Sequence, residues 1–135
     1  MNYRKINNNK VSLLGMGCMR LPIDENNEIN VEKTEEMIKY AMENGINYYD
    51  TAYPYHNGQS EIVIGNILSK YPRKSFFLAS KMPSWHLKSL DDAKGSLHKI
   101  QVAFSDEFPN ELRFKINILN EENIGRVHMI IAKGN

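Results

Sequence analysis

The chain lacks the features on which several protein classes depend. Its 135 residues include one cysteine, Cys18, which excludes an intramolecular disulfide and any site built from several thiolates. No stretch approaches the roughly 18 consecutive apolar residues that span a bilayer, and the polar, asparagine-rich start has no apolar signal segment. We therefore expect no membrane partner and a location in the reducing cytoplasm.

Neither sign of charge is in excess. The 17 Lys and Arg nearly balance the 16 Asp and Glu, for a formal net charge of +1, so no basic surplus is left to neutralise phosphates and we expect no nucleic-acid partner. His56 and His86 have no second and third ligand at metal spacing, which predicts no metal site. With 41% hydrophobic residues, the chain can form one modest core.

The hydrophobic pattern of the first two thirds indicates an α/β fold. Apolar runs at 11–16, 46–52 and 76–79 predict three strands, and the third, a short continuous run, is typical of a strand buried on both faces. The starts are about thirty residues apart, which suits one strand, one helix and two short loops. Repeated βα units and a parallel sheet follow from this spacing.

Two helices are predicted between these strands. In residues 31–44, Met37, Ile38 and Ala41 share one face, as in an amphipathic helix. Asn30 suits its N-cap, and Gly45 suits the left-handed position after its end. The second helix, residues 60–70, places its apolar side chains on one stripe.

The last forty residues do not continue this rhythm. Residues 111–119 alternate apolar and charged or polar side chains, which predicts a half-buried strand, and 127–132 is another strand candidate. We therefore divide the chain into an α/β segment, 1–95, and a divergent β-rich tail, 96–135. Two hypotheses for the tail stay open: a frameshift or gene truncation near Lys94 or Gly95, or a native cap that pairs with an exposed sheet edge.

Ligands of parallel α/β sheets bind at the carboxyl ends of the strands. Asp50, Tyr55 and Lys81 are predicted there. A protonated lysine beside an aspartate favours the ionised form of a nearby phenol, so that a tyrosine can act as a proton donor near neutral pH. Taken singly, each residue has a simpler interpretation: a turn aspartate, an aromatic lid and a solvated strand terminus.

Three motifs resemble the aldo-keto reductases. They are Leu-Gly-Met-Gly-Cys-Met-Arg-Leu-Pro at 14–22, Gly-Ile-Asn-Tyr-Tyr-Asp-Thr-Ala-Tyr-Pro-Tyr at 45–55 and Gly-Gln-Ser-Glu-Ile-Val-Ile-Gly at 58–65. The first of them, and Ser-Lys-Met-Pro-Ser-Trp at 80–85, look most like a bacterial branch whose full-length members carry a C-terminal iron–sulfur cluster. One cysteine cannot hold that cluster.

The resemblance implies an NAD(P)H-dependent reduction of aldehydes or ketones. Tyr55 would be the acid, Lys81 the modulator of its pKa, and Asp50 the partner of Lys81. Trp85 would contact the substrate. The residues that it assigns to a bound NADPH or NADH are Gly17, Cys18, Met19 and Asp50.

The resemblance covers about residues 3–94 and implies the first three βα units of a TIM (β/α)8 barrel, a fold of about 250 residues. The family's histidine after the fourth strand has no counterpart, since neither His98 nor His128 follows the expected apolar run. Most cofactor-binding strands of the family are also missing. We therefore expect absent or very weak turnover, and as an alternative a non-catalytic fragment that self-associates through exposed sheet edges.

Overall fold

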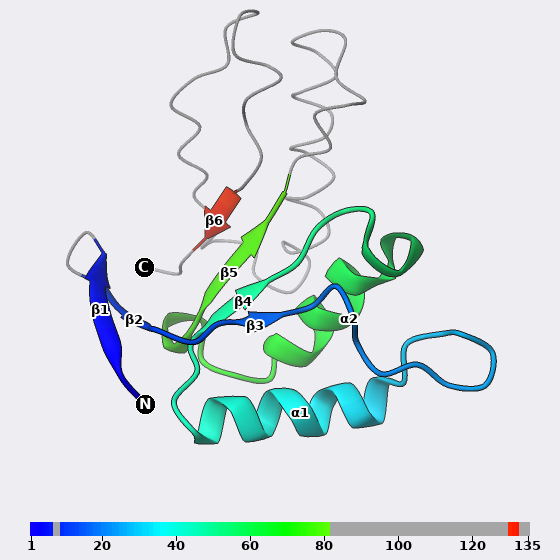
Figure 1. The fold of residues 1–135 in the computed structure, drawn as a ribbon, viewed down its shortest axis with the longest axis horizontal. Helices are drawn as coiled ribbons and strands as arrows, with labels where there is room; N and C mark the ends of the chain where they lie inside the picture. The colour runs from blue at the N-terminus through cyan, green and yellow to red at the C-terminus, as the bar shows by residue number, and fades with distance from the viewer. Residues whose placement is uncertain (7–8, 82–129, 133–135) are drawn as a thin grey trace, which may run out of the picture.

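The computed structural model describes residues 1–6, 9–81 and 130–132. It contains a two-stranded sheet and a four-stranded sheet, with two helices packed against the larger one (Figure 1). The strands of the larger sheet lie in the order β3-β4-β5-β6. Its elements, with the two short 3₁₀ turns, are β3 (Met16–Gly17), α1 (Val31–Glu43), β4 (Tyr48–Asp50), η1 (Tyr55–Gly58), α2 (Gln59–Leu68), η2 (Arg73–Ser75), β5 (Phe77–Ser80) and β6 (Ile130–Ala132).

The connections confirm the predicted α/β fold. β3 pairs in parallel with β4, and β4 in parallel with β5, so α1 and α2 are crossover helices of two successive βαβ units. The predicted burial of the third strand is also confirmed, because all four residues of β5 are buried. β6 runs antiparallel to β5, and the two hypotheses for the origin of the tail both stay open.

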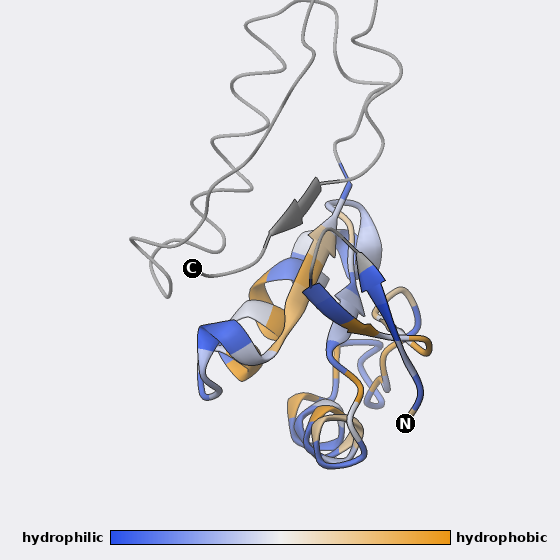
Figure 2. Ribbon diagram, turned by 90° about the vertical axis from the view of Figure 1, so that its left-hand side faces the viewer, coloured by the Kyte–Doolittle hydropathy of each residue, from blue (hydrophilic) through white to orange (hydrophobic). Residues whose placement is uncertain are grey.

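The core lies between the two helices and the sheet. Ile38 of α1, Ile64 of α2 and Tyr49 of β4 are each 0% exposed and belong to one cluster. Tyr49 lies opposite Leu78 in the strand register, so these side chains share the face that the helices cover. Both helices carry hydrophilic and hydrophobic residues in Figure 2, as amphipathic helices do.

The ends of α1 follow from local hydrogen bonding. The Asn30 side chain accepts the backbone N–H of Lys33 at 3.0 Å, which confirms the predicted N-cap. At the other end Gly45 has a φ of +84°, and the N–H of Ile46 donates to the carbonyl of Ala41 at 2.9 Å. This is the left-handed closure that glycine allows without a Cβ clash.

The first predicted strand, 11–16, is wrong as a single element. Val11 belongs to β2 (Asn9–Ser12), which pairs antiparallel with β1 (Tyr3–Ile6), while Met16 belongs to β3. Between them the Ser12 hydroxyl donates to the carbonyl of Leu14 at 2.7 Å, which turns the chain. One apolar run therefore serves two sheets.

The hairpin β1–β2 lies at the amino ends of the parallel strands (Figure 1). The side chain of Asn47, just before β4, accepts the N–H of Ser12 at 2.8 Å and donates to the carbonyl of Lys10 at 2.9 Å. The hairpin is thus fastened at the end of the sheet opposite Asp50 and Lys81.

Two further expectations meet different outcomes. Met37 is 45% exposed, so its predicted place on the buried face of α1 is wrong; Ile38, Ala41 and Thr34 form that face instead. The strand predicted at 111–119 lies outside the described residues. β6 lies within the candidate strand 127–132.

The buried side chain of Ile64 is expected to stabilise the folded chain. Ile64→Ala is expected to lower the free energy of unfolding by about 2–5 kcal/mol, because it leaves a cavity in the core. Ile62 lies on the same helix and is 46% exposed, so Ile62→Ala should change this energy by less than about 0.5 kcal/mol. Urea unfolding followed by circular dichroism measures both; equal losses would contradict this packing.

Cys18 should be chemically inert in the folded chain. It is free and 0% exposed, and burial, with the nearby charge of Asp50, raises its pKa to about 12. Because the thiolate is the reactive form, iodoacetamide should modify Cys18 slowly at mildly alkaline pH and rapidly in urea, as followed by mass spectrometry. Fast modification without denaturant would show that the thiol is accessible.

Candidate active site

The carboxyl ends of β3, β4 and β5 bring the predicted site residues together. Gly17 lies opposite Asp50, and Asp50 lies opposite Ala79 in the strand register. Lys81 follows β5 directly, and Tyr55 begins the turn η1 after β4. Residues far apart in sequence thus meet at one edge because parallel strands end on the same side.

The ammonium of Lys81 is held by two acceptors. Its Nζ lies 2.5 Å from Oδ1 of Asp50 and 3.1 Å from the backbone carbonyl of Thr51. The side chains of Lys81 and Asp50 are 31% and 29% exposed, so the pair is partly shielded yet open to a ligand. A charge-assisted hydrogen bond in such a setting is stronger than one at a fully exposed site.

This environment favours the protonated form of Lys81. Partial burial acts to lower the pKa of Lys81, but the hydrogen bond from Lys81 to Asp50, together with the neighbouring Tyr55, outweighs it and raises this pKa above the ordinary value. Because a raised lysine pKa moves deprotonation to higher pH, Lys81 carries its positive charge throughout the neutral range.

Tyr55 lies beside this charge. Its backbone N–H donates to the carbonyl of Ala52 at 3.1 Å, which folds the loop back over the strand ends. The Nζ of Lys81 is 5.1 Å from the centre of the Tyr55 ring, within the range of a cation–π contact. The predicted trio Asp50, Tyr55 and Lys81 therefore forms one cluster.

The loop that carries Tyr55 is held in an uncommon backbone conformation. His56 and Asn57 have φ values of 50° and 54°, and Gly58 has a φ of 86°. Successive left-handed residues are costly unless their surroundings hold them. The Nε2 of His56 accepts the N–H of Leu21 at 3.0 Å, which ties this loop to the loop after β3.

Two polar side chains of α2, Ser60 and Glu61, connect that helix to the strand ends beside the trio. Ser60 donates to the carbonyl of Cys18 at 3.0 Å, and its hydroxyl lies 2.9 Å from that of Thr51. Glu61 accepts a hydrogen bond from Ser80. Sequence reasoning assigned no role to these side chains, or to His56. The available signal was that Thr51, Ser60 and Glu61 stand inside the motifs at 45–55 and 58–65.

The residues predicted to contact a cofactor differ in accessibility. Gly17 is exposed, and nothing lies within 4 Å of the position that a Cβ would take there. Met19 is 58% exposed, whereas the thiol of Cys18 is buried. The backbone N–H of Cys18 donates to the carbonyl of Asp50 at 2.7 Å. Cys18 therefore contacts the end of β4 through its main chain.

The remaining site predictions have different outcomes. Trp85, predicted to contact substrate, and His86, His98 and His128 lie outside the described residues. Within the described chain, no group of three His, Cys, Asp or Glu could hold a metal ion. No helix in the same residues is long and apolar enough to cross a membrane.

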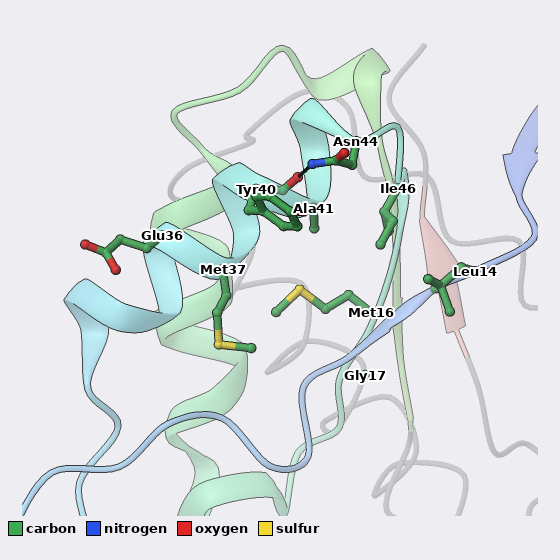
Figure 3. Close-up of a pocket in the computed structure, with 10 residues that line it drawn as sticks. Leu14, Met16, Gly17, Glu36, Met37, Tyr40, Ala41, Asn44 and Ile46 are labelled. Atoms are coloured by element: carbon green, nitrogen blue, oxygen red, sulfur yellow. Dashed lines mark hydrogen bonds between the residues drawn. The ribbon is translucent and has the colours of Figure 1, made fainter. Parts of the chain in front are cut away.

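A separate hollow of about 580 Å³ lies between α1 and the chain leading into β3 (Figure 3). Among the predicted site residues described, it touches only Gly17. Its apolar lining comes from Leu14, Met16, Met37, Tyr40, Ala41 and Ile46. The hollow is thus a surface distinct from the Lys81–Asp50 pair.

Known proteins match this chain over most of its length. The model of the Aldo/keto reductase family matches residues 13–107. A curated relative from Glycine max, "Probable aldo-keto reductase 1", is 26% identical over 137 residues. That match covers 93% of this chain and 39% of the relative, so the chain spans about two fifths of the relative's length.

Solved structures give the same result. The thermostable aldo-keto reductase Tm1743, in complex with the inhibitor epalrestat, matches with a TM-score of 0.63 and 26% identity over 78% of this chain and 39% of that chain. The holo form of aldo-keto reductase AKR11C1 from Bacillus halodurans matches with a TM-score of 0.60 and 27% identity over 78% of this chain and 37% of that chain.

A third structure supports the fold alone. The aldo-keto reductase from Klebsiella pneumoniae, in complex with NADPH, has a TM-score of 0.57 and 19% identity over 76% of this chain and 33% of its own. The closed barrel that the sequence resemblance implies stays a prediction. With a family model matched over more than half of its residues, and the strand-end motifs assembled in space, this chain belongs to the aldo-keto reductase family.

Proposed function

We propose that the site serves the NAD(P)H-dependent reduction of an aldehyde or ketone to an alcohol. The observation that carries this proposal is the contact of the Lys81 ammonium with Asp50 at 2.5 Å, beside the ring of Tyr55. A phenol that can donate a proton, a fixed cation beside it and an open strand end suit the protonation of a carbonyl oxygen.

Each member of the trio has a defined task in this proposal. Tyr55 donates its phenolic proton to the carbonyl oxygen as a hydride adds to the carbonyl carbon, and it regains a proton from solvent. Lys81 stabilises the negative charge that remains on the Tyr55 oxygen. Asp50 holds the ammonium in place, so that the charge is oriented before the reaction begins.

The exposed residues at the neighbouring strand ends suit a cofactor. Gly17, Met19 and Asp50 are accessible, and Cys18 would take part through its backbone. A reduced nicotinamide cofactor, when bound, supplies the hydride. These residues would contact it on the side of the cluster that Gly17 leaves open for lack of a side chain.

The 135 residues are expected to turn over weakly on their own. They span 39% of the curated relative, and we expect neither His98 nor His128 to take the family's role of orienting the carbonyl. The substrate class, a small-molecule carbonyl compound, and the choice between NADH and NADPH belong to this proposal.

Aldehyde reduction by the purified chain with NADPH tests it. We expect absent or trace alcohol formation by gas chromatography. Any trace should fall by about 10²-fold or more in Tyr55→Phe, because the general acid is lost. Tyr53→Phe is the matched control, since Tyr53 is 42% exposed in the same loop and should leave the trace unchanged.

The contrary outcomes are distinct. Equal trace formation in the chain and in both variants would remove Tyr55 as the acid. Robust turnover that depends on Tyr55 would show that these residues alone form a competent enzyme, against our expectation.

A second candidate function is self-association without catalysis. The observation that favours it is the edge of β3, which has one neighbour among the described strands, beside the apolar hollow of Figure 3. Tyr40 and Leu14 at this hollow are 69% and 58% exposed. An open edge next to exposed apolar side chains is a common site of chain association.

Light scattering on the purified chain tests this second candidate. We expect dimers that Tyr40→Lys dissociates, because a charge would enter the apolar contact; Glu36 and Glu43 lie one turn away and keep the lysine compatible with α1. Ile62→Lys, at an exposed position of α2, should leave the dimer intact. A monodisperse monomer would remove the basis for this candidate.

A further inference from the structure

We propose that Ser60 and Glu61, at the start of α2, are positioning residues that hold Lys81 on Asp50 through Thr51 and Ser80. The inference deepens the proposed function and rests on it for the chemistry that Lys81 would perform. It concerns side chains whose hydrogen bonds go to Cys18, Thr51 and Ser80 and not to the side chains of the trio itself.

Ser60 acts through Thr51. The hydroxyl of Ser60 is fully buried and donates to the carbonyl of Cys18 at 3.0 Å. Because a hydroxyl has one proton, the 2.9 Å contact between Ser60 and Thr51 must be donated by Thr51. The backbone carbonyl of that same Thr51 accepts from the Lys81 ammonium at 3.1 Å.

Glu61 acts through Ser80. Ser80 is 2% exposed and donates a hydrogen bond to the carboxylate of Glu61, which is 4% exposed. Ser80 directly precedes Lys81, so this bond fixes the main chain from which the lysine extends. Glu61 lies in the first turn of α2, where the helix dipole stabilises a negative charge.

Together the two adjacent residues fasten all three parallel strand ends. Ser60 reaches Cys18 after β3 and Thr51 after β4, while Glu61 reaches Ser80 at the end of β5. The distance from Lys81 to Asp50 depends on how the ends of β4 and β5 lie relative to each other. Fixing both ends to one helix therefore fixes that distance.

The buried carboxyl group of Glu61 indicates a role beyond filling space in the core. Desolvation raises the pKa of Glu61 above its ordinary value, which means that its charged form is costly in this place. An apolar side chain could fill the same space without that cost. A purely structural role would leave the lysine unaffected when the bond is lost.

The test reads the pKa of Lys81 directly by NMR of the labelled side-chain amine in the full chain. Glu61→Ala, Ser60→Ala and Ser80→Ala are each expected to lower this pKa, in the same direction as the reference variant Asp50→Asn, because the ammonium is held less closely on its acceptors. Glu61→Gln should restore most of the original value, since its amide oxygen can accept the Ser80 hydroxyl.

Ile64→Ala is the matched control. It loosens the same helix through a cavity and touches none of these hydrogen bonds, so the pKa of Lys81 should stay unchanged. The proposal is overturned if Glu61→Ala or Ser80→Ala leaves the pKa of Lys81 unchanged, or if Ile64→Ala lowers it as much. Ser80→Ala removes one oxygen only, and it keeps the test decisive if Glu61→Ala does not fold.

The readout separates this proposal from the proposed activity. A lowered pKa in these variants supports the positioning role even where turnover is absent and the catalytic proposal fails. Where trace turnover is present, the variants should lower kcat by about tenfold to hundredfold with little change in KM. Turnover that depends on Tyr55, with an unmoved Lys81 pKa, would retain the function and overturn the positioning role.

Discussion

The contact between the Lys81 ammonium and the Asp50 carboxylate is the constraint around which this molecule is arranged. The two residues are separated by 31 positions in the chain, and only the parallel pairing of β4 with β5 brings them to one edge. A lysine near this edge without a partner would be a mobile, solvated charge. Held by a carboxylate and a backbone carbonyl, it becomes a fixed positive charge beside the ring of Tyr55.

Different elements hold the two ends of the parallel sheet. At the amino ends, the β1–β2 hairpin is fastened through Asn47, and this region contributes stability. At the carboxyl ends, short polar side chains from α2 meet the strand termini, and the loop carrying Tyr55 is held in left-handed backbone through His56. In parallel α/β folds generally, ligand sites lie at the carboxyl ends of the strands and the opposite end contributes stability.

Much of the fold could be predicted because its signals are local. The N-cap at Asn30, the left-handed Gly45 and the apolar run before Ser80 each depend on a few neighbouring residues. The split of residues 11–16 between two sheets could not be predicted, since it is set by the pairing of β2 with a polar strand, β1. The exposure of Met37 escaped prediction for a similar reason: a helical face is defined by what packs against it.

The sequence by itself determined the βα rhythm and the family resemblance, and it named Asp50, Tyr55 and Lys81 as candidate site residues, because periodicity and motifs are carried by residues close together in the chain. Only the tertiary structure decided that His56 binds the loop after β3 and that Ser60 and Glu61 connect the strand ends. Their hydrogen bonds join residues 35, 42 and 19 positions apart. Such bonds leave no local pattern, since a buried hydroxyl or carboxyl needs a partner but its own neighbourhood does not specify which one.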